Sequence, residues 1–274
     1  MKGVSFGQYY PADSVIHRLD PRAKVIMAIL YIVCTFLCKN LSGFVALVVL
    51  SVALILISRI PLGMVLRSMR PLLLIIAFTS VINIFLTKGE TRLTPETWKI
   101  SIYAEGVWNA VFMVLRISAL IVGTGIFLTY TTTPIALTDA LEQLMSPLKK
   151  LKVPVHDFAM MMTIALRFIP TLTEETEKIM NAQKARGADF TTGSLLKRAK
   201  ALVPILVPLF VSAFNRAFEL ATAMECRCYH GGEGRTRLNV LHFRATDWLA
   251  MILLLAFGVG IFFLNRYGFG YTLR

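Results

Sequence analysis

Charged residues are scarce in this chain, and acidic residues are the scarcest. Only 16% of its 274 residues are charged and 56% are hydrophobic, whereas charged residues make up about a quarter of an average soluble protein. The 16 acidic residues are outnumbered by 29 lysines and arginines, so the formal net charge is +13. This composition excludes a disordered chain and is typical of a membrane protein with several spans. It favours anionic lipid or acidic proteins as partners, and we expect no nucleic acid.

Motifs for nucleotide chemistry and for common membrane enzymes are also missing. No Gly-x-x-x-x-Gly-Lys-Ser/Thr phosphate loop occurs, so we do not expect the chain to hydrolyse ATP by itself. The aspartate clusters of intramembrane prenyl transferases and the His-Glu-x-x-His helix of metalloproteases are absent. The four cysteines do not follow the pattern of a secreted disulfide framework, and we interpret them as free thiols. We therefore predict no catalytic residue, cofactor or bound metal.

Long apolar runs predict about five transmembrane helices. A helix needs about 20 mostly apolar residues to cross the hydrocarbon core. The segments that approach this length are residues 24–41, 43–60, 71–87, 107–129 and 247–264. The predicted fold class is an all-α polytopic membrane protein. Residues 1–129 would hold an N-terminal cytoplasmic segment and four spans, and residues 247–274 would hold the final span and an external tail.

The lysines and arginines are distributed unevenly among the connecting segments, and this predicts the orientation. A cytoplasmic N-terminus places twenty-two of them on the cytoplasmic side and six outside, with Arg116 inside a span. Because positively charged loops remain in the cytoplasm, we expect the N-terminus inside and the C-terminus outside.

Arg116 is the single charge in the interior of a predicted span. Inserting a charged side chain at the bilayer centre costs about 2.5–3.5 kcal/mol, so we expect Arg116 to face protein or water. It could contact a partner or a substrate, or it could hydrogen-bond to carbonyl groups of the helix bundle. Because the interiors of the other spans offer no acid to pair with it, the sequence leaves both roles open.

Residues 130–246 are too many for a loop and too apolar for an independent soluble domain. The prolines in this region predict helical pieces near residues 134–146, 155–169, 171–188 and 195–228. The two longest apolar runs, Phe158–Leu166 and Ala201–Phe214, are shorter than a membrane span. We therefore expect a cytoplasmic-side domain of amphipathic helices that are interfacial or re-entrant.

The piece 195–228 has one narrow polar stripe and is apolar elsewhere. Such a helix must be covered by lipid, by its neighbours or by another membrane protein. Nearby methionines tolerate repacking against different partners, although filling the domain's own core is their more usual role. The residues predicted to contact a membrane partner are Met160, Met161, Leu209, Phe210, Ala213 and Phe214.

Two motifs centred on arginine end helices of this region. Residues 183–188 read Gln-Lys-Ala-Arg-Gly-Ala, and residues 224–229 read Met-Glu-Cys-Arg-Cys-Tyr, forty-one residues later. In the first motif a glycine follows the arginine at a helix C-cap position. A guanidinium at such an end can bind a carboxylate of another protein through two hydrogen bonds. A basic residue near a helix C-terminus is also favourable without any partner, because of the helix dipole.

Together with the five spans, these motifs resemble the transmembrane T component of energy-coupling factor (ECF) transporters, which are bacterial importers of vitamins and metals. The likeness extends to the run His-Arg-Leu-Asp-Pro-Arg-Ala-Lys at residues 17–24 and to Thr133-Pro134. It implies a non-catalytic scaffold in the bacterial cell membrane. Two coupling helices of this scaffold would dock on two ABC-type ATPases, and its apolar helices would hold a membrane-embedded, substrate-binding S component.

The residues that the resemblance places at the ATPases are Ala185, Arg186, Gly187, Glu225, Cys226, Arg227 and Cys228. The first motif matches the Ala-Arg-Gly pattern of the family in full. The second motif has Cys226 where alanine is common and Cys228 where glycine is common, so Arg227 is its matching residue.

A self-contained permease for a metal ion or small molecule is the alternative function. Cys226, Cys228 and His230 would then form an inner site, since thiolates and imidazole suit zinc or copper. No fourth ligand is evident, and residues two apart at a helix end point to different faces. A permease would bind or move its substrate when purified alone, whereas a T component would not.

Overall fold

The computed structural model describes residues 9–87, 91, 103–190, 194–231 and 240–267, and these residues are mainly helical, with no β-strand among them. Contacts divide the chain into two compact units. Residues 1–141 and 240–274 form one unit, here called the membrane unit, and residues 142–239 form the other, here called the arm unit. The predicted all-α fold is confirmed.

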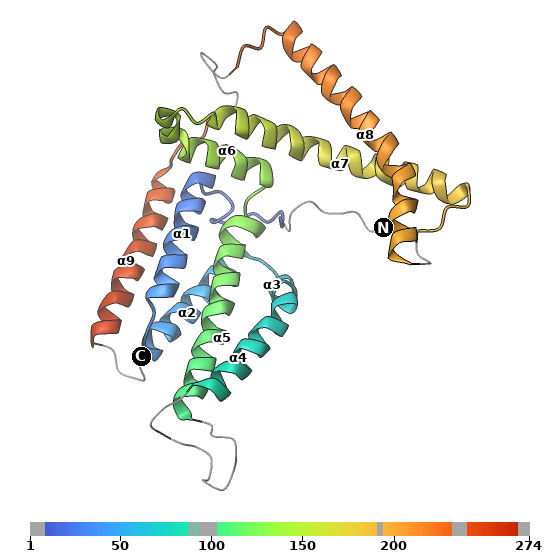
Figure 1. Ribbon diagram of the computed structural model, residues 1–274. Helices are drawn as coiled ribbons and strands as arrows, with labels where there is room; N and C mark the ends of the chain where they lie inside the picture. The colour runs from blue at the N-terminus through green and yellow to red at the C-terminus, as the bar shows by residue number, and fades with distance from the viewer. Residues whose placement is uncertain (1–8, 88–90, 92–102, 191–193, 232–239, 268–274) are drawn as a thin grey trace. The chain divides into compact units, whose positions relative to one another are not determined.

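The membrane unit contains six helices and most of a seventh (Figure 1). The six are α1 (Pro21–Leu37), α2 (Leu41–Ser58), α3 (Leu62–Met69), α4 (Leu73–Leu86), α5 (Ala104–Thr124) and α9 (Ala245–Tyr267), and α6 (Pro134–Leu144) extends to the unit boundary. A 3-10 turn, Arg70–Leu72, joins α3 to α4, and a π-helix, Gly125–Tyr130, continues α5.

Helix α1 contributes many of the buried residues of the membrane unit and packs against α5 and α9 (Figure 1). Asp20 caps its N-terminus by accepting a hydrogen bond from the Arg22 amide, and Pro21 occupies the first turn, where its missing N–H costs least. Tyr31 is fully buried, and its hydroxyl is hydrogen-bonded to Ser51 at 2.8 Å and to a carbonyl of α5 at 3.1 Å. A Cβ at Gly123 would overlap the Tyr31 ring, so a glycine is needed for α5 to approach α1 this closely.

Four of the five predicted spans coincide with helical segments that are long and apolar enough to cross a membrane. These segments are Leu41–Ser58, Leu62–Leu86, Ala104–Tyr130 and Ala245–Tyr267. The predicted end of the first span at residue 41 is wrong, because α1 ends at Leu37 and is 17 residues long. Helices α1 and α2 are consecutive and are connected by only Cys38–Asn40.

The arm unit consists of a 3-10 segment, Ser146–Leu151, and the two longest helices, α7 (Val155–Ala185) and α8 (Leu195–Cys226). The predicted break at Pro170 is wrong, because α7 continues through it. Pro170 costs one backbone hydrogen bond, but it lies on an exposed side of a helix that extends fifteen residues in each direction. Helix α8 also differs from expectation. Although its longest apolar run is short, the unbroken helix from Leu196 to Cys226 is long and apolar enough to span.

Candidate functional site

Helix α7 ends in a Schellman motif, the six-residue helix end whose last residues turn back onto the helix. The Ala188 amide donates to the Gln183 carbonyl at 3.0 Å, and the Gly187 amide donates to the Lys184 carbonyl at 2.9 Å. Gly187 adopts φ +85°, which glycine reaches without steric cost. Arg186 is the C-cap residue and its side chain is exposed. The motif therefore holds the arginine at the tip of the helix.

Helix α8 ends in the same motif, although its sequence differs. The Tyr229 amide donates to the Met224 carbonyl at 3.1 Å, and the Cys228 amide donates to the Glu225 carbonyl at 2.9 Å. Arg227 is the exposed C-cap residue. Cys228 takes the place of glycine at φ +54°, a conformation that costs a residue with a Cβ roughly 1–2 kcal/mol. The two predicted arginines thus occupy equivalent positions in equivalent helix ends.

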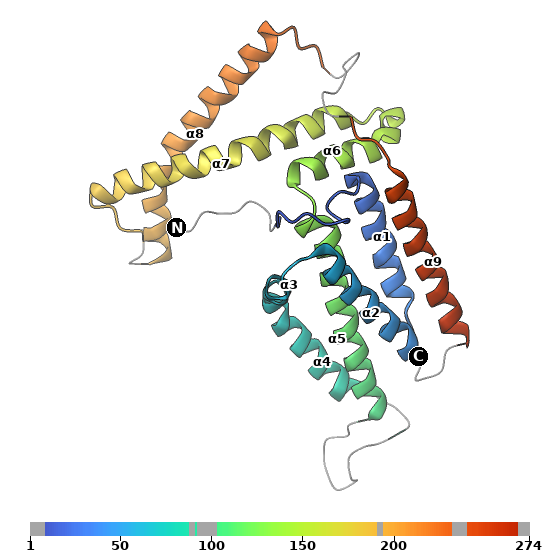
Figure 2. The same cartoon turned by 180° about the vertical axis from the view of Figure 1, so that it is seen from behind.

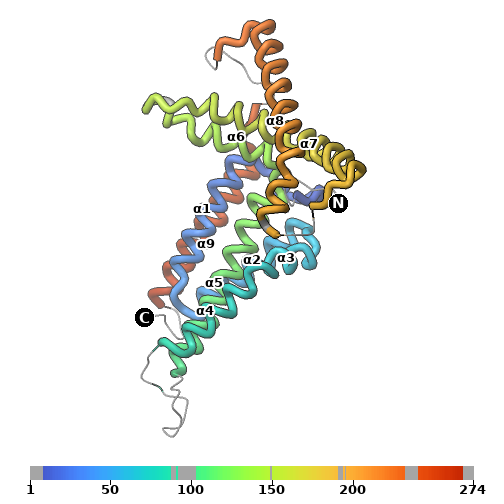
Figure 3. The backbone as a smooth tube through the Cα atoms, turned by 45° about the vertical axis from the view of Figure 1, so that its right-hand side comes forward, coloured from blue at the N-terminus to red at the C-terminus, as the bar shows by residue number. Residues whose placement is uncertain are grey.

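Helices α7 and α8 cross (Figure 3), and polar contacts join them there. Arg216 Nη2 donates to Glu175 Oε2 at 3.1 Å. A hydrogen bond from Ser212, together with the charge of Arg216, lowers the pKa of Glu175 although burial acts in the opposite direction. The carboxylate is therefore the form that holds the crossing at neutral pH.

The crossing lies at the same distance from both arginine tips. Glu175 precedes Arg186 by eleven residues, and Arg216 precedes Arg227 by eleven residues. The part of each helix from the crossing to its arginine is here called an arm. At 1.5 Å per residue, each arm measures about 16 Å. The forty-one-residue spacing of the two motifs is also the spacing of the ion pair. The arm unit therefore presents two similar tips on two arms of equal length.

The six residues predicted to contact a membrane partner do not share one exposed surface. Phe210 and Phe214 are each 65% exposed and Met161 is 54% exposed. Met160, Leu209 and Ala213 are half-buried. Leu209 and Ala213 are close on the helix surface to Ser212, which faces α7. The outward apolar surface of α8 instead includes Phe218, which is 76% exposed and was not among the predicted residues.

Arg116 forms a hydrogen bond to a carbonyl group of the helix bundle, which is one of the two roles that the sequence left open. Its Nη2 donates to the Cys38 carbonyl at 2.9 Å, and its guanidinium carbon lies 5.4 Å from the centre of the Phe44 ring. The carbonyl and the ring both stabilise a cation without any acidic partner. Its Nε atom is buried and has no hydrogen-bond partner within the part of the chain that the structure describes.

The cysteines are free thiols, as predicted. Cys34 and Cys38 are buried, whereas Cys226 and Cys228 are exposed on either side of Arg227. His230 Nδ1 is hydrogen-bonded to the Cys228 carbonyl at 2.8 Å. Over the described ranges, no three cysteine, histidine or acidic side chains form a group that could hold a metal. The inner site of the permease alternative therefore has no structural support among these residues.

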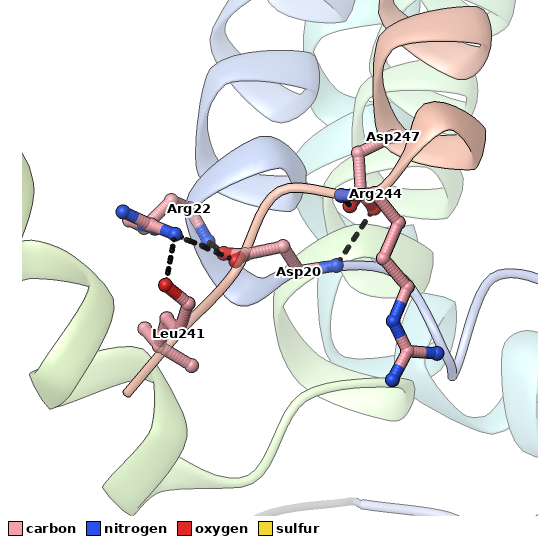
Figure 4. A network of polar contacts seen from close by, with 5 residues as sticks. All are labelled: Asp20, Arg22, Leu241, Arg244 and Asp247. Carbon is pink, nitrogen blue, oxygen red and sulfur yellow. Dashed lines mark hydrogen bonds and ion pairs between the residues drawn. The ribbon is translucent and has the colours of Figure 1, made fainter. Parts of the chain in front are cut away.

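A buried polar network at the start of α1 and α9 was not predicted (Figure 4). Asp247 is fully buried and accepts hydrogen bonds from the amides of Asp20 at 2.9 Å and Arg244 at 2.7 Å. Arg22 binds the Asp20 carboxylate at 2.9 Å and the Leu241 carbonyl at 2.8 Å. Burial acts to raise the pKa of Asp20, but the hydrogen bonds and charge of Arg22 outweigh it and lower the pKa. The network joins α9 to the start of α1.

Lys24 is the second unpredicted feature, because the sequence indicated only its charge. The side chain is 2% exposed, and its Nζ donates to the carbonyls of Thr131 at 2.7 Å and His17 at 3.1 Å. It thus joins α1 to the segment after α5 and to the segment before α1. A lysine in the run at residues 17–24 was the only sequence signal for this contact.

Comparisons with known proteins agree with this architecture. A family model described as cobalt transport protein, CbiQ, matches residues 12–238. Relatives named energy-coupling factor transporter transmembrane protein EcfT cover nearly the whole chain. The relative from Thermosediminibacter oceani is 50% identical over 92% of this chain and 94% of its own. The relatives from Clostridium kluyveri and Bacillus subtilis are 49% and 45% identical, over 92% and 97% of this chain and 93% and 99% of theirs.

Proposed function

Because the chain belongs to the CbiQ and EcfT family of ECF transporter transmembrane components, we propose that it is the scaffold that couples partner ATPases to substrate uptake. Two cytoplasmic ABC-type ATPases bind and hydrolyse ATP, and a membrane-embedded S component captures a vitamin or a metal ion. The observation that carries the proposal is the pair of equivalent helix ends, each with an exposed arginine at its C-cap. The scaffold itself supplies no catalytic group.

Docking follows from the position of the arginines. A guanidinium fixed at a helix tip can enter a groove on an ATPase and bind a carboxylate there through two hydrogen bonds. The last carbonyls of each helix also favour a cation at this position. One arginine for each ATPase accounts for two tips of the same geometry on one chain.

Coupling follows from the crossing between Glu175 and Arg216. When ATP binding brings the two ATPases together, their grooves carry the two arginine tips with them. Because the arms are equal in length and joined at the crossing, this motion reorients α7 and α8 as a pair. The outward apolar surface around Phe210, Phe214 and Phe218 is the surface that we assign to the S component.

The orientation follows from the distribution of basic residues. With the N-terminus and the arm unit in the cytoplasm and the C-terminus outside, twenty-two lysines and arginines lie on the cytoplasmic side and six lie outside. Helix α8 has sufficient length to span, but it carries Arg216 and Glu219 in its polar stripe. We therefore place α8 at the cytoplasmic interface of the bacterial cell membrane.

Charge reversal at the tips tests docking. Arg186→Glu or Arg227→Glu places a carboxylate against an acidic groove and should weaken ATPase association by about 2–5 kcal/mol, the usual cost of disrupting one partner of a buried charge pair. The double variant should abolish uptake. The measurement is the amount of ATPase that copurifies with the chain from membranes, together with substrate uptake by cells.

Lys184→Glu is the matched control, because Lys184 is exposed and lies two residues before Arg186. It reverses one positive charge at the same helix end, as Arg186→Glu does, but leaves the C-cap arginine in place. We expect it to retain most of the ATPase. Equal loss in the control would indicate a general charge effect, and full uptake by the double variant would refute docking through the arginines.

A further inference from the structure

An apolar groove in the membrane unit is lined mainly by residues of α1, α2 and α9. Figure 2 shows α1 beside both of the other helices. Its volume of about 440 Å³ lies within the range of about 300–1,000 Å³ that is common for sites that bind small ligands. Met27 and Leu254 form a buried floor, whereas the wall residues Ile57, Leu249 and Leu253 are at least half exposed. Thr246 is the only polar residue in the lining. The groove therefore suits a hydrocarbon chain.

The groove lies between the second half of α2 and the first half of α9. At their other ends, about ten residues from the lining, the two helices are joined by Asn40 Nδ2, which donates to the carbonyls of Leu264 and Asn265. At the opposite end, the segment Val15–Leu19 contributes to the lining. The cavity therefore has a wall from a third segment, which the surface of two packed lipid-facing helices lacks.

Two exposed arginines are close in sequence to lining residues at this end. Arg59 follows the wall residue Ile57 by two positions, and Arg244 directly precedes the lining residue Ala245. Neither guanidinium makes a hydrogen bond or an ion pair with another residue in the described ranges, and Figure 4 shows the Arg244 side chain extending away from the Asp247 network. The charge of Arg59 acts on Asp13, but Asp13 is bound by Arg18 at 2.7 Å. Both cations are therefore accessible to an anionic ligand.

From this combination we infer that the groove binds one acyl chain of an anionic phospholipid, with the phosphate of its headgroup held by Arg59 and Arg244. The arginine end is on the side of the unit that carries Arg59, Arg67 and Arg70, which we assign to the cytoplasm. The cytoplasmic leaflet is the one in which anionic lipids attract basic groups near the surface. A bound lipid would fill the space between α2 and α9 and join them where no hydrogen bond does.

Photolabelling in nanodiscs tests this site with the full-length chain alone, so the result does not depend on the proposed ATPase and S-component partners. The probe is phosphatidylglycerol with a photoreactive group on one acyl chain, and phosphatidylcholine with the same chain is the headgroup control. We expect mass spectrometry to find labels on the groove residues of α2 and α9. Phosphatidylglycerol should label them more strongly, by about fivefold for each arginine, because one basic group near anionic lipid contributes about 1 kcal/mol.

Variants separate the chain-binding groove from the headgroup site. Ala250→Phe fills the groove and should abolish its labelling, whereas Ile252→Phe adds the same side chain at an exposed position of α9 outside the lining and should leave it unchanged. Arg59→Gln with Arg244→Gln should remove the preference for phosphatidylglycerol but keep the acyl-chain labels. A competition experiment on the unaltered chain tests the groove without any substitution in the core. Unlabelled phosphatidylglycerol should reduce the groove labels, because that site saturates, and should leave the labels near Ile252 unchanged.

Several outcomes would overturn the inference. Equal labelling of the groove and of the surface around Ile252 would mean ordinary contact with bulk lipid. Equal labelling by both headgroups would remove the role of the two arginines. Protection of the groove only after a partner membrane protein is added would identify a protein as its occupant.

Discussion

The two helix ends of the arm unit have the same backbone geometry but different sequences. Both end in the same pair of backbone hydrogen bonds, with an exposed arginine at the C-cap. They differ at the next residue, which is Gly187 at φ +85° in α7 and Cys228 at φ +54° in α8. The left-handed turn is therefore kept even where a side chain makes it costly. The feature that the two ends share is the projection of an arginine, and glycine is one way to obtain it.

The shared geometry of the two helix ends should be disturbed most strongly by a branched side chain at position 187. Gly187→Val should weaken the helix end by about 1–2 kcal/mol, because a β-branched residue resists a positive φ. This corresponds to roughly 5–30-fold faster hydrogen exchange at the Ala188 amide, which donates to Gln183. ATPase binding through Arg186 should fall with it.

Gly187→Asn is the control for this substitution, since asparagine tolerates the left-handed conformation better than valine does. No side chain or backbone atom lies within 4 Å of a Cβ placed at Gly187, so steric overlap does not explain a loss. If valine and asparagine had equal effects, the backbone conformation would not be the cause.

The equivalence of the two helix ends can also be tested by giving α8 the glycine that α7 has. Cys228→Gly removes the Cβ at φ +54° and should stabilise the end of α8 by up to about 1 kcal/mol. Exchange at the Tyr229 amide should slow accordingly, and ATPase binding should be retained. Cys226→Ala serves as the matched control, because it removes the other exposed thiol at a helical position and should leave this amide nearly unchanged. Faster exchange in Cys228→Gly would contradict the common geometry.

The smallest effect is expected at the crossing that gives the arms their equal length. Glu175 and Arg216 are partly exposed, so solvent weakens their attraction and Glu175→Ala should destabilise the arm unit only slightly. Because the pKa of Glu175 is lowered on folding, its contribution is present at neutral pH and is lost as the pH falls through that lowered value. A double-mutant cycle with Arg216→Ala measures the coupling, and strict additivity of the two changes would exclude an energetic role for the pair.

Local signals in the sequence predicted the helices well and the contacts between them poorly. Apolar length predicted five spans, and four of them coincide with helical segments long enough to cross a membrane. Helices α7 and α8 end within three residues of their predicted positions. Proline was a less certain signal, since Pro170 lies inside α7 although a break was expected there. A proline in the interior of a long helix costs one hydrogen bond, and the rest of the helix can compensate for that cost.

Contacts between distant residues could not be derived from one sequence. Asp247 is hydrogen-bonded to Asp20, 227 positions away, and no local pattern connects them. The pairing of Glu175 with Arg216 depends on how α7 crosses α8. The arginine motifs were found because each is short and ends a helix. Their equivalence became evident only from the backbone hydrogen bonds, since Ala-Arg-Gly and Cys-Arg-Cys share a single residue.

Site-specific photo-crosslinking in the assembled complex tests the central claim most directly. A photoreactive phenylalanine at position 188 or position 229, the equivalent residues that follow the two tips, should form an adduct with an ATPase subunit in either case. The same group at position 218, on the outward apolar surface of α8, should instead form an adduct with a membrane protein or with lipid. Adducts with an ATPase from both tips and none from position 218 are the result that this account predicts. An intact complex in which neither tip reaches an ATPase would contradict it.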